Sequence, residues 1–79
     1  MYVATKGTAM SREIKIILNG CDEVVPEGST IMYLLEMLNE HDQHLIVEHN
    51  YLFVPPSQYA DRTVAEGDTI EFINPNLGG

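Results

Sequence analysis

The sequence has few of the features that place a chain in a membrane or outside the cell. Its 79 residues contain a single cysteine, so no internal disulfide can stabilise the fold. The apolar runs are only a few residues long, far shorter than the roughly 20 residues of a membrane-spanning helix. No basic start followed by an apolar stretch indicates a secretory signal. We therefore expect a cytoplasmic protein that packs a core of its own, without a membrane partner.

Basic residues are also scarce. Four lysines and arginines stand against twelve aspartates and glutamates, which gives a formal net charge of −8. A chain this acidic repels phosphate backbones, so we expect no nucleic-acid binding. The charge fits a protein partner with a basic surface, but it could equally serve only to keep a small domain soluble.

What the chain does contain is enough apolar material for one small folded domain. Hydrophobic residues make up 44% of the sequence, which is typical of an ordered globule. Residues 14–18 alternate as a β-strand does, and its apolar side consists of Ile14, Ile16 and Leu18. Asn19-Gly20 follows, a strong hairpin signal because both residues accept a positive φ. A second strand then returns and ends at Pro26.

The apolar period changes after this hairpin. Residues 31–38 carry apolar side chains at the spacing of an amphipathic helix: Ile31, Leu34, Leu35 and Leu38. We predict a helix from Thr30 to Asn39, with Ser29 or Thr30 capping its first free N–H groups.

Three further strands are expected after the helix. Two short ones lie within residues 45–54, joined around His49-Asn50, and Pro55-Pro56 ends the second. Residues 57–64 are polar and predict a covering loop with one tight helical turn. The last strand covers the segment TIEFI, with Ile70 and Phe72 on the same side.

The predicted order β-β-α-β-β-β is typical of a two-layer α+β domain with one helix on a mixed sheet. The first and last strands could lie side by side in its centre, parallel to each other. We expect a flexible leader over residues 1–9, the folded domain over residues 10–73, and a flexible tail over residues 74–79.

The sequence offers no convincing catalytic set. Cys21 is followed by two acidic residues, whereas a nucleophilic cysteine needs a base and basic surroundings. Glu66 and Asp68 flank Gly67 and are interpreted as turn formers. The three histidines have no metal-motif spacing, and we interpret them as solvated surface residues: His41, His44 and His49. We expect no bound cofactor and no metal site.

The distinctive group is the chain end itself, NPNLGG. Glycine has no Cβ, so two terminal glycines can pass through a narrow channel and present the α-carboxylate to another enzyme. Pro75 has no N–H to offer a neighbouring strand, so the tail is expected to project from the sheet. The pattern describes a carrier whose active group is Gly79, with Leu77 and Gly78 as the threading segment.

The chain resembles the β-grasp sulfur carriers, the ThiS and MoaD family related to ubiquitin, over about residues 14–79. The resemblance rests on IILNG, STIMYLLEML, IVEHNYLFVP, EGDTIEFI and the terminal GG, taken in that order. It implies a β-grasp fold. Val54-Pro55 followed by Tyr59 leans towards the ThiS branch, whereas Pro75 is similar to the proline-containing tails of MoaD.

The resemblance also implies a mechanism. An adenylating enzyme similar to ThiF or MoeB would activate Gly79 with ATP, and sulfur from a persulfide donor would convert it to a thiocarboxylate. The sulfur would pass to thiamin thiazole through a thiazole synthase, or to molybdopterin through the large subunit of molybdopterin synthase. A ubiquitin-like modifier joined to lysines through Gly79, and a plain interaction domain, remain open alternatives.

Overall fold

The computed structural model describes residues 12–75. The leader predicted over residues 1–9 and the last four residues of the predicted tail lie outside this range. Seven elements follow one another along the described chain: β2 (Glu13–Leu18), β3 (Cys21–Pro26), α1 (Ile31–Met37), β4 (Ile46–His49), β5 (Leu52–Val54), the 3₁₀ helix η1 (Pro56–Gln58) and β6 (Thr69–Ile73). No helix among them is long and apolar enough to cross a membrane.

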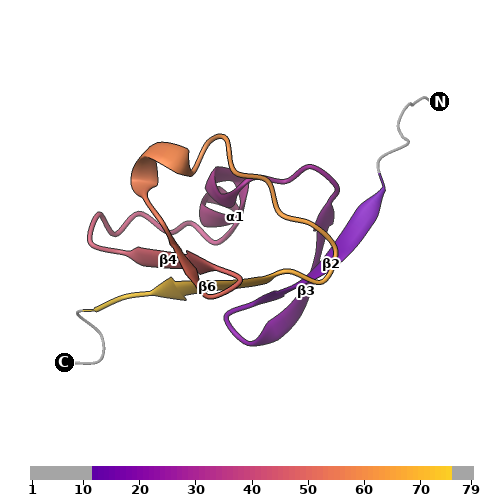
Figure 1. Cartoon of the computed structure of the whole chain (residues 1–79), viewed down its shortest axis with the longest axis horizontal. Coiled ribbons are helices and arrows are strands. Elements are labelled where there is room, and N and C mark those ends of the chain that lie inside the picture. The colour runs from indigo at the N-terminus through magenta and orange to yellow at the C-terminus, as the bar shows by residue number, and fades with distance from the viewer. Residues whose placement is uncertain (1–11, 76–79) are drawn as a thin grey trace.

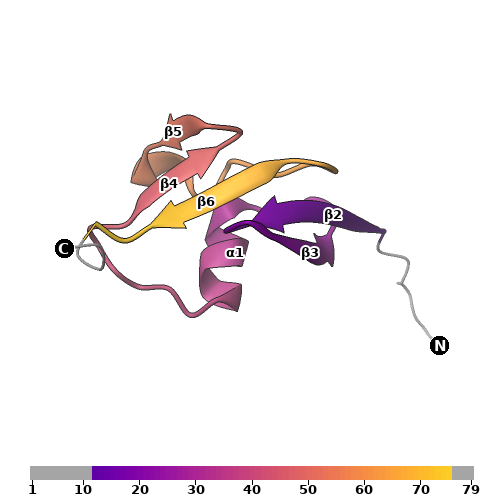
Figure 2. The ribbon, with the colours of Figure 1, turned by 90° about the horizontal axis from the view of Figure 1, so that it is seen from below.

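The five strands form one sheet in the order β3-β2-β6-β4-β5, and α1 lies across one face of it (Figures 1 and 2). β2 and β6 are parallel, and the register pairs Leu18 with Ile70. An antiparallel hairpin flanks this pair on each side, β2 with β3 and β4 with β5. The predicted α+β architecture, including the parallel central pair, is therefore confirmed.

The core lies between the sheet and α1. Alternation along β2 buries Ile14, Ile16 and Leu18, as the sequence predicts, and leaves Lys15 and Ile17 on the open face. The remaining buried apolar residues come from the other four strands, from α1 and from the connecting segments: Val25, Ile31, Leu34, Leu35, Leu45, Val47, Val54, Val64 and Ile70. Phe72 packs against the edge of this core on the same side as Ile70.

The helix is shorter than predicted. Thr30 is the N-cap, and its hydroxyl accepts a hydrogen bond from the N–H of Tyr33 at 3.0 Å. At the other end the Glu40 N–H donates to the carbonyl of Leu35, and Asn39 takes a left-handed φ of 56°. This closing arrangement stops the helix at Met37, two residues before the predicted end.

The early stop changes the fate of Leu38. We predicted Leu38 on the buried stripe, but it is 42% exposed, so this prediction is wrong. Leu38 is the C-cap residue, where the backbone leaves the helical path. The apolar spacing continues to Leu38 in the sequence, but the helix does not, so only Ile31, Leu34 and Leu35 are buried.

Candidate functional site

The chain end leaves the fold from the central strand β6. β6 is held by β2 on one side and by β4 on the other, where Ile46 pairs with Ile73 at the last position of the strand. The parallel pairing with β2 ends at Leu18. The next residue, Asn19, adds a further backbone contact to β6, because its N–H donates to the carbonyl of Ile70 at 2.9 Å. The side-chain Oδ1 of Asn19 also accepts the N–H of Phe72 at 2.8 Å.

These contacts fix the strand almost to the start of the predicted tail. The left-handed backbone of Asn19, φ 52°, turns its side chain towards β6 while the residue forms the hairpin turn predicted from Asn19-Gly20. Asn74 is half-buried and Pro75 is exposed. The chain thus leaves the core at a defined point. Leu77, Gly78 and Gly79 lie outside the described residues, so their role stays a prediction.

The open face of the sheet beside this exit combines apolar and acidic side chains. Ile46, Ile73 and Phe53 are 37%, 40% and 61% exposed. Glu48 lies between them, opposite Phe53 on one side and Glu71 on the other. An apolar surface with carboxylates is suited to a protein partner that offers apolar and basic groups.

The other candidate residues do not form a catalytic site. Cys21 is an exposed free thiol at the start of β3. His41 and His44 are exposed, as predicted. Within residues 12–75 no group of three or more histidine, cysteine or acidic side chains could hold a metal ion.

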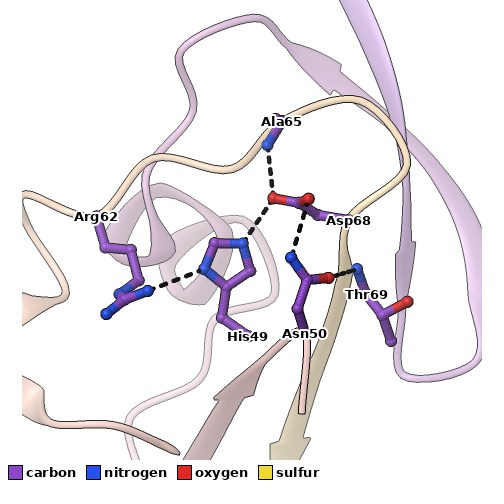
Figure 3. Close-up of polar contacts among 6 residues, drawn as sticks. All are labelled: His49, Asn50, Arg62, Ala65, Asp68 and Thr69. Carbon is purple, nitrogen blue, oxygen red and sulfur yellow. Dashed lines mark hydrogen bonds and ion pairs between the residues drawn. The ribbon is translucent and has the colours of Figure 1, made fainter. Parts of the chain in front are cut away.

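His49 is where the sequence interpretation fails. We predicted a solvated surface histidine, but His49 is 9% exposed, and its Nε2 lies 2.6 Å from Oδ2 of Asp68 (Figure 3). Nδ1 of the same ring lies 3.4 Å from a guanidinium nitrogen of Arg62. Because Arg62 can only donate, this contact needs an unprotonated Nδ1, so the proton lies on Nε2, which donates to Asp68.

Asp68 connects the start of β6 to the hairpin of β4 and β5. Its Oδ2 accepts the N–H of Ala65 at 2.8 Å, which confirms the predicted turn-forming role. Its Oδ1 accepts from the side-chain amide of Asn50 at 3.1 Å, and Oδ1 of Asn50 accepts the N–H of Thr69 at 2.8 Å (Figure 3). The described contacts of these polar groups all lie within the fold. We therefore interpret the cluster of His49, Asn50, Arg62 and Asp68 as a structural brace and not as a reaction centre.

Alternation could have placed His49 correctly. Val47 and His49 are two residues apart in one strand and so share a face, and Val47 is fully buried. The partner could not have been identified in this way, because Asp68 lies 19 residues further along the chain. Its position depends on the pairing of β4 with β6.

The brace predicts an acid-sensitive contribution to stability. Burial raises the pKa of Asp68, but the hydrogen bonds from His49, Ala65 and Asn50 outweigh burial and hold the pKa below its ordinary value. Because the pKa of Asp68 is lower in the folded state than in the unfolded state, the ionised side chain stabilises the fold at pH values above the unfolded-state pKa. This stabilisation is lost as the pH falls through the folded-state pKa. We expect Asp68→Asn to lower the free energy of unfolding by about 1–3 kcal/mol at pH 7. This deficit should shrink as the pH falls below about 4.

Urea unfolding of both proteins between neutral and acid pH measures this difference. Asp61→Asn is the matched control, because Asp61 is exposed and should leave the stability unchanged at each pH. A deficit for Asp68→Asn that stays constant down to the lowest pH would contradict the assignment.

The five-stranded mixed sheet crossed by one helix, with a parallel central pair between two hairpins, defines a β-grasp domain. A ThiS family model matches residues 9–79, and the chain belongs to the ThiS family. Among solved structures it is similar to the thiamine biosynthesis protein ThiS from Geobacter metallireducens, at 25% sequence identity and a TM-score of 0.69. The match covers 76% of this chain and 91% of that chain. No curated protein sequence matches. Family and fold together support a small sulfur-carrier protein of thiamin biosynthesis.

Proposed function

We propose that the chain carries sulfur as a thiocarboxylate on Gly79 and delivers it to the thiazole of thiamin. The observation that carries this proposal is the ThiS family match, which extends through the last residue of the chain. The fold supports it, because β6 leads the chain out of the centre of the sheet beside an apolar and acidic surface.

The chemistry explains why such a carrier needs an activating enzyme. A carboxylate is a poor acyl donor, because its oxygen is a poor leaving group. Attack of the Gly79 carboxylate on the α-phosphorus of ATP releases pyrophosphate and gives an acyl-adenylate. The terminal sulfur of a persulfide then displaces AMP and forms a new C–S bond, which gives an acyl disulfide. A thiol next cleaves the S–S bond that came from the persulfide, so that the thiocarboxylate is released and the donor's remaining sulfur ends in a disulfide with that thiol. ATP is bound by the partner, an adenylating enzyme similar to ThiF or MoeB, and the need for ATP supports a cytoplasmic site for the cycle.

The charges on the open face of the sheet are consistent with binding to a separate activating enzyme. Glu48 and Glu71 pair with each other across β4 and β6, and within residues 12–75 the cations on the open face are confined to Lys15 on β2. A partner with basic groups would recognise this half of the sheet while its active site receives the tail.

Reconstitution with the downstream enzyme tests the proposed acceptor. The chain is incubated with its adenylating enzyme, ATP, a persulfide donor and a thiazole synthase with that enzyme's own substrates. We expect thiazole to form in proportion to the chain supplied, and none to form when ATP is left out. Replacing the synthase with a molybdopterin synthase large subunit and its substrate should give no sulfur transfer. Transfer only in the second mixture would contradict the proposed destination, and isopeptide-linked products would favour a protein modifier.

A further inference from the structure

The outer strand β5 and the turn before it present an exposed apolar edge, which β4 separates from the strand β6 that leads to the chain exit. Three consecutive large side chains are exposed there: Tyr51, Leu52 and Phe53 at 71%, 69% and 61%. The first residue of β5 is level with Ile70, near the start of β6, because His49 on the intervening strand β4 pairs with both Leu52 and Ile70. The hairpin turn therefore lies at the opposite end of the sheet from Ile73 (Figure 2).

The hairpin holds this apolar edge in one conformation. Asn50 and Tyr51 form its turn with φ angles of 51° and 70°, and a tyrosine in left-handed backbone is unfavourable by about 1–2 kcal/mol. The brace offsets this cost, because the Asn50 N–H donates to Thr69 at 2.7 Å and the Asn50 side chain binds Asp68. An ordered apolar edge loses little entropy on binding.

The two edges of the sheet differ in character. The outer strand β3 carries Asp22 and Glu23 and ends in Pro26, features that prevent pairing with another strand. β5 carries no charge. Its length is set on one side by the left-handed Tyr51 and on the other by Pro55, which has no N–H. Any strand that adds to β5 is thereby restricted to a register centred on Phe53.

The backbone of Phe53 is suited to such an addition. In a hairpin with a two-residue turn, the first pair exchanges hydrogen bonds and the next pair does not. The first pair here is His49 with Leu52, so Phe53 directs its N–H and C=O away from β4. One outward donor and one outward acceptor on the same residue are self-complementary under a twofold axis.

We propose that two copies of this chain associate through antiparallel pairing of their β5 strands, centred on Phe53. Each Phe53 would donate its N–H to the other's carbonyl, with the two rings adjacent on the open face. Because β5 runs parallel to β6, antiparallel β5 strands direct the two chain exits to opposite ends of the dimer. Both carboxylate ends stay accessible.

Charge permits this arrangement and predicts a salt dependence. The nearest acidic residue on the open face is Glu48, which lies opposite Phe53 on β4. Two β5 strands would separate the Glu48 side chains of the copies by three strand spacings, about 14 Å, beyond the Debye length of about 8 Å at physiological salt. The net charge of −8 on each copy still opposes association at low salt. Added salt should therefore strengthen the dimer.

Sedimentation equilibrium between about 10 μM and about 1 mM tests the proposal, since an interface this small is expected to be weak. The mean mass should rise from one chain towards two, and further when salt is added. Phe53→Lys and Leu52→Lys should remain monomeric throughout, as both side chains are exposed and the fold does not need them. Val24→Lys, on the other edge and 57% exposed, should associate like the unchanged chain.

Amide exchange gives a second readout that a non-specific contact would not change. The Phe53 N–H should become protected at high concentration, whereas the amides of β3 should not change. A chain that stays monomeric at every concentration would overturn the proposal, and the exposed edge of β5 would then be a candidate binding surface for a different protein. Association that survives Phe53→Lys, or that continues beyond two copies, would overturn it as well.

Discussion

Deleting Gly79 is expected to abolish thiocarboxylate formation without changing the stability of the domain. The deletion shortens the reach of the tail by up to about 3.6 Å, enough to withdraw the carboxylate from in-line attack on ATP. Gly78→Val keeps the length and adds a branched Cβ, so it tests the width of the channel alone. We expect both variants to lose nearly all thiolation by the adenylating enzyme, measured by intact-mass spectrometry.

Two controls separate a chemical defect from a folding defect. Urea unfolding should give the same midpoint for the parent chain and both variants, because both positions follow the last strand. Asn74→Ala, at the half-buried start of the tail, keeps both the length and the terminal glycines and should still be thiolated. If the chain without Gly79 is thiolated as readily as the parent, the threading account is wrong.

Replacing Leu34 with alanine is expected to lower the free energy of unfolding by about 2–5 kcal/mol. Leu34 is fully buried at the centre of α1, between the helix and the sheet. The loss combines the transfer energy of the missing carbon atoms with the cavity that they leave. Small domains have a total stability of only about 5–15 kcal/mol, so this variant should be unfolded by far less urea.

The matched control lies on the outer side of the same helix. Met32 is 37% exposed, and Met32→Ala keeps the helix propensity while it removes little buried surface. It should cost less than about 1 kcal/mol. Equal losses for Leu34→Ala and Met32→Ala would contradict the packing of α1 on the sheet.

Elements with a clear local period could be predicted from the sequence. The alternation of Ile14, Ile16 and Leu18 specified which side of β2 is buried, and the Asn19-Gly20 turn specified the hairpin. The parallel pairing of β2 with β6 was suggested only by the order of the elements. The resemblance to β-grasp carriers added the fold, which the sheet order confirms.

Features set by tertiary contacts could not be predicted in this way. The helix stop at Met37 depends on the left-handed backbone of Asn39, which a regular apolar stripe does not reveal, so Leu38 was misplaced. The brace between His49 and Asp68 joins residues that only the pairing of β4 with β6 brings together. The proposed role of Gly79 is of a third kind, because it would depend on the channel of a partner enzyme, which this fold does not define.

The most direct test of the account is to locate the added sulfur. After incubation with the adenylating enzyme, ATP and the persulfide donor, the intact chain should gain the mass difference between one sulfur and one oxygen. Fragmentation should place that gain on the C-terminal fragment that contains Gly79, and a reducing agent should not remove it. A gain of a whole sulfur atom on the fragment that contains Cys21, reversed by a reducing agent, would indicate a persulfide on the exposed thiol and contradict the account.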